Sequence, residues 1–283
     1  MNIPWKLKSV AFSALNYMPD VTLYILQKYV TGNSKVKFST PYVGWEYHKN
    51  SVAKMGAKRL LEFGAGKNLA QNIFLSALVE QQVVVDLFPM LDVNQVNDGI
   101  RRLKEIGAPI DGRSIADLDD LEKIYSIRYL APLDMRKTNF NDGEFDICIS
   151  TNTLEHIPRE DIESIFLELF RIVKPNGCIS AMIDYSDHYA HTDRSITRLN
   201  YLRFTEAEWK QHNHAKHYQN RMRHDHYAEI FKYAGFEVME EDPTNIETRE
   251  SGRLRPELLT GHKEDFATTG FWRLLRPAQF DAK

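Results

Sequence analysis

A short glycine-containing turn is the first segment of the sequence that could do chemistry. Gly64 and Gly66 follow the apolar run at 59–63, and the helical pattern of 69–80 comes directly afterwards. Because glycine has no Cβ atom, such a turn can bring the backbone close to a bound ligand. Asp86 ends the next apolar run, where an acidic side chain commonly binds ribose hydroxyl groups. Together these features predict a nucleoside-binding site.

Three classes of ligand compete for this turn, and the residues around it separate them. A Walker A loop requires glycine where Leu61 stands and serine or threonine where Asn68 stands. A dinucleotide site requires a third glycine where Leu69 stands, because that glycine allows the close helix packing that accompanies pyrophosphate binding. S-adenosylmethionine (SAM) has no phosphate group and needs neither feature. The sequence therefore favours SAM.

A dense polar cluster follows the apolar run at 178–183 and contains the best candidates for catalysis. Methyl transfer from SAM is an in-line displacement on carbon, and a hydroxyl acceptor must also lose a proton. We expect His188 to be the general base, with Asp187 or Asp193 orienting its ring. A loop held together by its own hydrogen bonds explains the cluster nearly as well. His156 is a competing base, although its position at the start of a helix also suits a local backbone role.

These candidates follow predicted strands in a chain that alternates between strand-like and helix-like segments. Such alternation is typical of βαβ units, which right-handed crossovers arrange as an open sheet. We predict an α/β fold with a doubly wound, seven-stranded, mostly parallel, Rossmann-like sheet and a ligand outside the carboxyl ends of its strands. Residues 107–127 are expected to be a long acidic connection. The predicted strands are 59–63, 83–86, 128–133, 145–150, 178–183, 236–239 and 270–275, and the predicted helices are 69–80, 93–106, 161–173 and 226–234.

The chain is predicted to contain an N-terminal region and a catalytic domain. Residues 1–57 would form a helical cap or lid, with a short second helix at 21–30, and residues 58–283 would form the domain that binds SAM. An amphipathic foot on a membrane surface or on a partner is the alternative role for the N-terminal helices. Within the catalytic domain, residues 185–225 are expected to be an insertion that binds the acceptor.

Several motifs together resemble those of class I SAM-dependent methyltransferases. The turn at 62–66 is similar to their first motif, and Asp86 matches their ribose-binding acid. The segment at 145–156 is similar to their fourth strand and its trailing loop. The segment at 171–177 is similar to their Arg-x-Leu-Lys-Pro-Gly-Gly turn, with Asn176 in place of one glycine. The resemblance implies that the chain is a methyltransferase with SAM as its cofactor.

The same resemblance gives individual residues an expected role. Gly64 and Gly66 would lie against the methionyl part of SAM, and Asp86 would bind the ribose hydroxyls. Asp134 would face the adenine amine with Met135 packed on the ring, although a turn-forming role is the alternative for Asp134. The complete set expected to bind the cofactor is Glu62, Gly64, Ala65, Gly66, Asn68, Asp86, Leu87, Asp134, Met135, Thr151 and Asn152, the last two forming the floor below the sulfonium.

A metal site is the alternative use of the same polar residues. Metal-dependent small-RNA 2′-O-methyltransferases and quinone O-methyltransferases carry a similar Glu-x-x-Glu-His motif with later ligands. Oxygen and nitrogen ligands are available here from Glu155, His156, His188 and His191. Asn152, however, replaces the first glutamate of that motif, and Glu-His pairs also occur in metal-free relatives. We therefore predict no metal.

A second resemblance concerns the acceptor. The pattern Asp-x-Ser-Asp-His-x-x-His-x-Asp at 184–193, followed by Asn-x-Leu-Arg-Phe at 200–204, is similar to that of bacterial methyltransferases associated with surface-polysaccharide synthesis. It implies O-methylation of a sugar, or of a glycan with phosphate or carboxylate groups that arginine can bind. A membrane-facing lipid or quinone methyltransferase and a non-catalytic SAM-fold subunit are the alternatives. The residues expected to bind the acceptor are Tyr185, His191, Asp193, Arg221 and Arg223, although surface ion pairs explain the two arginines equally well.

Composition sets the remaining limits. The formal net charge is −3, so there is no overall positive field to attract nucleic acid, and we expect none as a partner. Cys148 and Cys178 lie in apolar runs without metal-ligand spacing, and we expect them to be reduced core thiols of a cytoplasmic protein. No apolar run reaches the roughly 20 residues that a membrane-spanning helix needs. Contact with the inner face of the membrane and the oligomeric state stay open.

Overall fold

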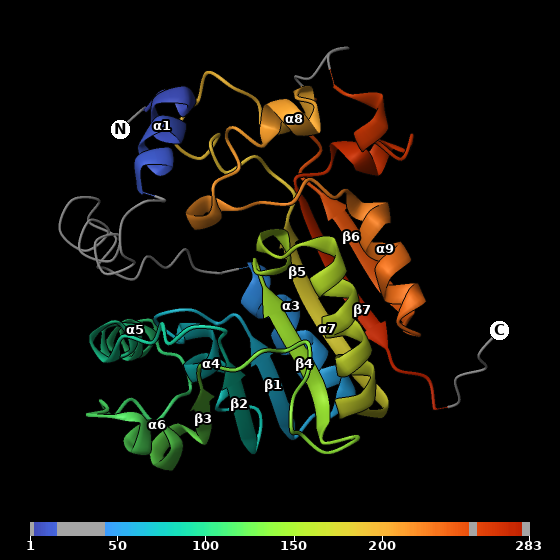
Figure 1. Cartoon of the computed structure of the whole chain (residues 1–283). Coiled ribbons are helices and arrows are strands. Elements are labelled where there is room, and N and C mark those ends of the chain that lie inside the picture. Colours follow the sequence, from blue (N-terminus) through green and yellow to red (C-terminus); the bar gives the residue numbers. More distant parts are fainter. Residues whose placement is uncertain (1–2, 16–42, 249–253, 279–283) are drawn as a thin grey trace.

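The strands of the protein form one sheet in which most neighbouring strands run parallel (Figure 1). The computed structural model describes residues 3–15, 43–248 and 254–278. The seven strands are β1 (Arg59–Phe63), β2 (Gln81–Val85), β3 (Ile127–Leu130), β4 (Phe145–Thr151), β5 (Val173–Asp184), β6 (Glu237–Thr244) and β7 (Thr269–Leu275). Their order is β3-β2-β1-β4-β5-β7-β6. β7 is antiparallel to both neighbours, and the other pairs are parallel.

All the strands predicted from the sequence are present, and the doubly wound, Rossmann-like fold is confirmed. Two strands are longer than predicted. β5 begins at Val173 because the expected turn at 175–177 pairs through its backbone with Arg276, just beyond β7. β6 extends to Thr244 along the full length of β7. Its apolar pattern stops early because β6 is an edge strand whose side chains are mostly exposed.

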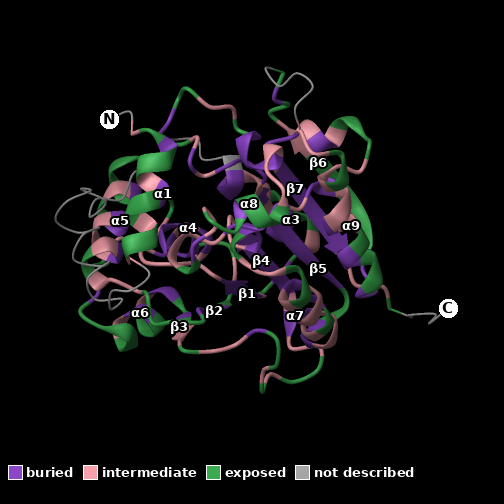
Figure 2. Cartoon of the chain, turned by 45° about the horizontal axis from the view of Figure 1, so that its top comes forward, coloured by how far each residue is buried: buried purple, intermediate pink, exposed green. Residues whose placement is uncertain are grey.

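Helices cover both faces of the sheet, because successive residues of a strand point to opposite faces. Leu61 and Phe63 of β1 pack in the cluster that also contains residues of α7 and α9. Leu60, directly before Leu61, belongs to the cluster with α3, while Val84 of β2 packs with α4, α5 and α6. Figure 2 shows the buried strands between the exposed outer surfaces of these helices. The helices are α1 (Trp5–Leu15), α3 (Val43–Met55), α4 (Ala70–Leu75), α5 (Val93–Glu105), α6 (Leu118–Tyr125), α7 (Arg159–Ile172), α8 (Glu206–Trp209) and α9 (His224–Tyr233).

Two helical segments differ from the prediction. The connection at 107–127 contains α6, whose first turn is capped by Asp117: its side chain accepts a hydrogen bond from the backbone N–H of Asp120 at 3.0 Å. The second difference is a helix that is shorter than predicted. The helix expected at 69–80 is α4, which ends at Leu75. The hydroxyl of Ser76 donates to the carbonyl of Ile73 at 2.7 Å, a local bond that competes with helix continuation.

The insertion after β5 packs against α1, above the carboxyl ends of the strands (Figure 1). Trp5 is buried with Tyr189 in a separate apolar cluster, and its backbone N–H donates to the Asp193 carboxylate at 2.8 Å. Within the predicted N-terminal region, α1 therefore rests on the predicted acceptor-binding insertion, whereas α3 packs on the sheet. The helix expected at 21–30 lies outside the described residues. Within the described ranges, no helix is both long and apolar enough to cross a membrane.

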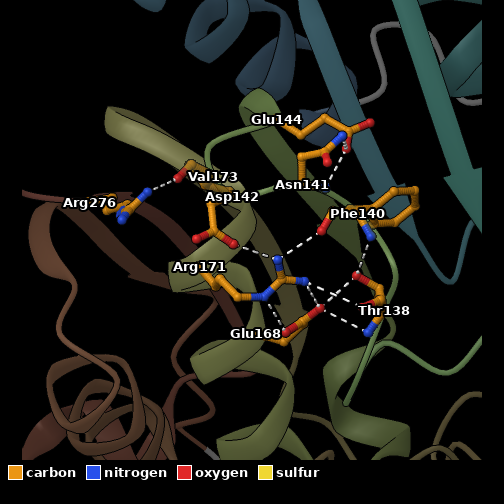
Figure 3. Close-up of polar contacts among 9 residues, drawn as sticks. All are labelled: Thr138, Phe140, Asn141, Asp142, Glu144, Glu168, Arg171, Val173 and Arg276. Carbon is orange, nitrogen blue, oxygen red and sulfur yellow. Dashed lines mark hydrogen bonds and ion pairs between the residues drawn. The ribbon is translucent and has the colours of Figure 1, made fainter.

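The loop between β3 and β4 is fixed by polar contacts with α7 (Figure 3). Arg171 of α7 donates to the Phe140 carbonyl at 2.8 Å and to the Asp142 carboxylate at 2.7 Å. Arg171 also donates to the Glu168 carboxylate at 2.6 Å. Glu168 in turn accepts a hydrogen bond from the backbone N–H of Thr138 at 2.8 Å. One guanidinium with several donors can fix a loop without regular secondary structure, because it binds carbonyl and carboxylate groups from different parts of the loop at the same time. Arg171 thereby holds the loop whose first residues form the predicted adenine site.

Candidate active site

A cavity of about 270 Å³ opens at the carboxyl ends of β1 and β2, where the sequence predicts the cofactor site. Five residues predicted to bind the cofactor line it: Gly64, Asp86, Leu87, Asp134 and Met135. A mostly apolar wall with a few placed polar groups is typical of sites for small molecules. The remaining lining residues are Phe63, Val85, Phe88, Met90, Leu133, Arg136, Thr153, His156, Ile157, Pro158, Asp161 and Ile165.

Asp86 is the buried acid of this cavity and is 3% exposed. Its carboxylate accepts hydrogen bonds from the Tyr129 hydroxyl at 2.9 Å and from the backbone N–H of Gly66 at 3.4 Å. Burial raises the pKa of Asp86 to about 6, although both hydrogen bonds oppose that rise. The glycine turn and the acid therefore form one site. Tyr129 was missed by the sequence analysis, although its place in β3, opposite Val84 of β2, was available as a signal.

The glycine turn uses its two glycines for different purposes. φ is 75° at both Gly64 and Gly66, a region that favours glycine. A Cβ atom at Gly64 would lie 2.3 Å from Cγ2 of Thr153, so this glycine is required by the packing of the protein itself. A Cβ atom at Gly66 would meet nothing within 4 Å, so the turn leaves space there. Gly64 therefore lines the cavity under a steric constraint, and Gly66 has open space beside its Cα atom.

Ala65 and Asn68 lie in the same turn and have structural contacts. The side-chain oxygen of Asn68 accepts a hydrogen bond from the backbone N–H of Ala70 at 3.0 Å and holds the start of α4. Ala65 packs against the apolar cluster beneath α4. Leu69 stands where a dinucleotide site needs its third glycine, and it is 1% exposed with φ 45°. This side chain fills the place where a helix would approach a pyrophosphate.

Glu62 and Thr151 belong to a buried polar network beneath the turn. Glu62 accepts hydrogen bonds from the side chains of Gln71 at 3.0 Å and Asn72 at 2.6 Å, and burial raises the pKa of Glu62 to about 8. Gln71 also donates to the Thr151 hydroxyl at 2.9 Å, which lies 3.0 Å from Nε2 of His48. Glu62 therefore positions the turn instead of facing the cavity. His48 was missed because only tertiary folding brings α3 to β4.

Asn152 lies beside that floor in an unusual backbone conformation. Its φ is 50°, and its backbone N–H donates to the Met182 carbonyl at 2.8 Å. In the described part of the chain, nothing donates a hydrogen bond to its buried Oδ1 atom. An unpaired buried acceptor is costly, so a donor from a ligand would be stabilising there.

Asp134 and Met135 reach the cavity from the loop after β3. Met135 is 6% exposed and packs into the core, as expected for a residue beneath a ring. The Asp134 carboxylate pairs with Arg136 at 2.6 Å, and Arg136 also contacts Asp161 at 2.8 Å. The hydrogen bond from Arg136 holds the pKa of Asp134 below its usual range. Asp134 is therefore a charged acceptor, and Arg136 and Asp161 are members of the site that the sequence analysis missed.

The polar cluster predicted after β5 is present, with His188 at its centre. The ring centroid of His188 lies 4.9 Å from that of His156 and 4.9 Å from that of His191. Asp184 places one carboxylate oxygen 3.5 Å from Nε2 of His188 and 3.4 Å from Nε2 of His191. His156 also lines the cavity, and its Nδ1 lies 2.8 Å from the Tyr218 carbonyl. The cluster therefore adjoins the predicted cofactor site.

The carboxylates predicted to orient His188, those of Asp187 and Asp193, form their described hydrogen bonds with other residues, so their orienting role stays a prediction. Asp187 is fully buried and accepts a hydrogen bond from the side chain of Asn200 at 2.9 Å. Asp193 accepts one from the backbone N–H of Trp5 at 2.8 Å. Both carboxylates hold turns of the insertion and its contact with α1, so Asp193 is also not available to an acceptor. A further carboxylate, that of Asp184 at the end of β5, lies 3.5 Å from Nε2 of His188.

Three further residues predicted to bind the acceptor are held by protein contacts. Arg223 is fully buried and donates to the backbone carbonyl of Tyr185 at 2.9 Å, and Arg221 donates to two carbonyl groups of the insertion. The hydroxyl of Tyr185 accepts a hydrogen bond from the Trp272 indole at 2.8 Å. These side chains stabilise the insertion, and their binding of an acceptor stays a prediction. Of the residues predicted to bind the acceptor, only His191, with its side chain 48% exposed, joins the polar cluster.

Glu155 completes the cluster. It is 1% exposed, and neither carboxylate oxygen accepts a hydrogen bond of normal geometry from any described residue. Burial, followed by the charge of Asp184, raises the pKa of Glu155 well above its usual range. Its ligand atom and those of His156 and His188 all lie within 4.8 Å of one another, and the same holds for Asp184, His188 and His191. Two groups of oxygen and nitrogen ligands thus share His188.

The sequence matches a family model described as a methyltransferase domain over residues 43–241. Among curated proteins, none matches the sequence significantly. Similar solved structures include the N-methyltransferase NodS from Bradyrhizobium japonicum (11% identity, TM-score 0.45, covering 83% of this chain and 94% of that chain). They also include a putative sarcosine dimethylglycine methyltransferase from Galdieria sulphuraria (14%, 0.47, 83% and 85%) and a SAM-dependent methyltransferase from Clostridium acetobutylicum (11%, 0.46, 90% and 98%).

Proposed function

Because the chain belongs to the methyltransferase-domain family, we propose that it transfers the methyl group of SAM to a hydroxyl group of a polar acceptor, with a sugar or glycan favoured. SAM is the expected cofactor of such an enzyme. The observation that carries the proposal is the position of His156. This residue lines the cavity and lies 4.9 Å, ring to ring, from His188. A methyl donor in the cavity would therefore adjoin side chains that can accept a proton.

The residues of the cavity fit SAM in their chemistry. Asp86 offers a carboxylate to the ribose hydroxyls, and the open backbone at Gly66 suits the methionyl part. Asp134 offers a charged acceptor to the adenine amine, above the apolar side chain of Met135. The unpaired Oδ1 atom of Asn152 offers a further acceptor near the floor. Nothing in this arrangement provides the helix packing that a pyrophosphate requires.

The protein would contribute alignment and proton removal, because the sulfonium of SAM already provides the leaving group. The acceptor oxygen forms the new bond to the methyl carbon while the carbon–sulfur bond breaks and its electron pair goes to sulfur. The hydroxyl proton passes to His188, and Asp184, 3.5 Å away, stabilises the imidazolium that results. Holding the donor in the cavity beside this cluster converts a bimolecular reaction into a positioned one.

The affinity for SAM should depend on pH through Asp86. Its carboxylate form accepts charge-assisted hydrogen bonds from ribose, and the protonated form does not. Because the pKa of Asp86 is raised to about 6, SAM affinity should be constant above neutral pH and weaken as the pH falls through that value. Well below that pKa, the affinity for SAM should fall by about tenfold for each pH unit, because one proton is taken up. Calorimetric titrations between pH 5 and 8 would measure it. Asp86→Asn should bind weakly with a flat profile, and an equally flat wild-type profile would rule out this role.

The glycan acceptor is supported by the resemblance of 184–193 to methyltransferases associated with surface polysaccharides, and by the polar character of the cluster. We place the reaction in the cytoplasm because Cys148 and Cys178 are both buried, unpaired thiols. A lipid or quinone acceptor is the second candidate. It is favoured by α1, where Leu7 and Val10 are 62% and 66% exposed while Lys8 contacts the His188 carbonyl at 3.3 Å.

Incubation with SAM and separate acceptor classes would test this assignment. The classes are free sugars, isolated envelope glycans, and quinones or lipids in vesicles, each analysed by mass spectrometry for the addition of one CH₂ unit. We expect the addition on sugars or glycans only, and its absence with His188→Ala protein. Addition only to vesicle-borne acceptors would favour the second candidate. Binding of SAM without transfer to any class would favour a non-catalytic subunit.

A further inference from the structure

We propose that the polar cluster holds a divalent ion of the first transition series between Glu155, His156 and His188. This inference rests on the proposed function and deepens it, because the ion would lie where the acceptor hydroxyl must react. The sequence alone predicts no metal, since Asn152 replaces one glutamate of a known metal motif. The fold gives a reason to expect a metal, because it brings His188, which follows β5, close to Glu155 and His156, which follow β4.

The first argument is the state of Glu155. Its side chain is almost completely removed from solvent, yet neither of its carboxylate oxygens has a hydrogen-bond partner among the described residues. A buried carboxyl group is kept neutral by its environment unless its charged form is paired, hydrogen-bonded or bound to a metal. The groups that face Glu155 are Asp184 and the imidazoles of His156 and His188. Of these, the imidazoles are good metal ligands, so a shared cation would satisfy the carboxylate and both rings at once.

The second argument is geometric. The ligand atoms of the three residues lie within 4.8 Å of one another. Oxygen and nitrogen ligands bind such ions at about 2.0–2.2 Å, so two ligands of one ion stand at most roughly 4.3 Å apart. Side-chain movements of less than about 1 Å would therefore close the site around an ion. Three protein ligands also leave positions open, as in catalytic metal sites.

The third argument is the set of contacts behind the ligands. His156 has Nδ1 2.8 Å from the Tyr218 carbonyl, an arrangement in which Nδ1 carries the proton and Nε2 is left to bind a metal. The Asp184 carboxylate lies 3.5 Å from Nε2 of His188, so a small movement would give this ring the same kind of support through Nε2 and leave Nδ1 for the ion. Second contacts of this kind are common at true metal sites. They are not needed by histidines that merely cover a surface.

A metal at this position would change one detail of the proposed reaction. It would supply Lewis acidity to the acceptor hydroxyl. His188 would then be a ligand, and the proton would go to His191, whose Nε2 lies 3.4 Å from Asp184 and whose side chain is 48% exposed. The two overlapping groups of side chains thus have separate tasks, one binding the ion and the other accepting the proton.

Calorimetric titration of the full-length, tag-free and metal-free protein with MnCl₂ and with ZnCl₂ would test the site. We expect one equivalent of at least one ion to bind, with at least tenfold weaker affinity in Glu155→Gln. His262→Ala is the matched control, because His262 is exposed and contacts Asp225 away from the cluster. Its metal affinity should equal that of the wild type. A cooperative thermal unfolding curve like that of the wild type would show that each variant is folded, and His156→Asn replaces Glu155→Gln if the latter does not fold.

Two results would overturn the inference: no binding of either ion, or equal affinity in the wild type and in the folded cluster variant. An absorption spectrum with Co²⁺ gives a second readout, since ligand-field bands should appear in the wild type and not in Glu155→Gln. The site and the proposed function can fail separately. If chelators do not affect glycan methylation, the metal site is ruled out and the proposed function is retained. If the metal binds but no methyl group is transferred to any acceptor, the metal site is retained and the proposed function is ruled out.

Discussion

Replacing His188 by alanine should lower the rate of methyl transfer by roughly 10²-fold or more, the scale of a lost proton-transfer group. The affinity for SAM should not change, because His188 does not line the cavity. The physical reason is that the acceptor hydroxyl loses the imidazole at the centre of its polar cluster, whether that ring accepts the proton or binds an ion. Initial rates with saturating SAM and a calorimetric SAM titration would measure the two effects separately.

The control for this result is another histidine that lies outside the cluster. His262→Ala removes an exposed ring that contacts Asp225, and it should transfer methyl groups at the wild-type rate. The rate of methyl transfer by Asp184→Asn should lie between the rates of these two variants. The substitution removes the negative charge beside His188 and His191 but leaves both rings in place. If His188→Ala turned over as fast as His262→Ala, the cluster would have no part in the reaction.

Replacing Asp86 by alanine should weaken SAM binding by roughly 10²-fold. A hydrogen bond to a charged group contributes about 1.5 kcal/mol or more, and two such bonds to ribose are lost. Each 1.4 kcal/mol is about a tenfold change in affinity, which gives the expected factor. The buried carboxylate has few protein partners, namely Tyr129 and the backbone of Gly66, so its removal should spare the fold. Calorimetry at pH 8 and a thermal unfolding curve would provide both measurements.

Two variants make the Asp86 experiment specific. Asp111→Ala removes an exposed acid that pairs with Arg113, far from the cavity lining, and should leave SAM affinity unchanged. Tyr129→Phe removes one hydrogen bond to Asp86 and should weaken SAM binding by a smaller factor. Equal SAM affinities in wild type and Asp86→Ala would show that this acid does not bind the cofactor.

The strands and the cofactor cavity could be predicted because their signals are local. Short apolar runs with turn residues between them identify β1 and β2, and the glycines and Asp86 follow directly at the ends of those strands. The chain order of a parallel sheet then brings these ends together. No knowledge of distant contacts is needed for that step. The same holds for Asp134 and Met135, which come directly after β3.

The partners of these residues could not be predicted, since they depend on contacts between distant segments. His48 reaches Thr151 across 103 positions, and Arg223 reaches Tyr185 across 38. An arginine surrounded by backbone carbonyls has the same sequence signature as one that binds a phosphate. Only its burial distinguishes the two, and burial is a property of the folded chain.

One further candidate could have been selected from the sequence. Asp184 ends β5 in the same way that Asp86 follows β2, and the reasoning that selected Asp86 applies equally to Asp184. We instead selected Asp187 and Asp193, although Asp193 is farther from His188 along the chain than Asp184 is. In a loop that turns immediately after a strand, the last strand residue and the residue four positions later face the same opening, as the 3.5 Å contact between Asp184 and His188 shows.

The central claim is that the cavity beside β1 and β2 binds a sulfonium nucleoside and not a dinucleotide. Separate calorimetric titrations of the wild-type protein with SAM and with NAD⁺ test it most directly. We predict that SAM binds with one equivalent per chain and that NAD⁺ produces no binding heat. Binding of NAD⁺ at this site, or no binding of SAM, would contradict the account.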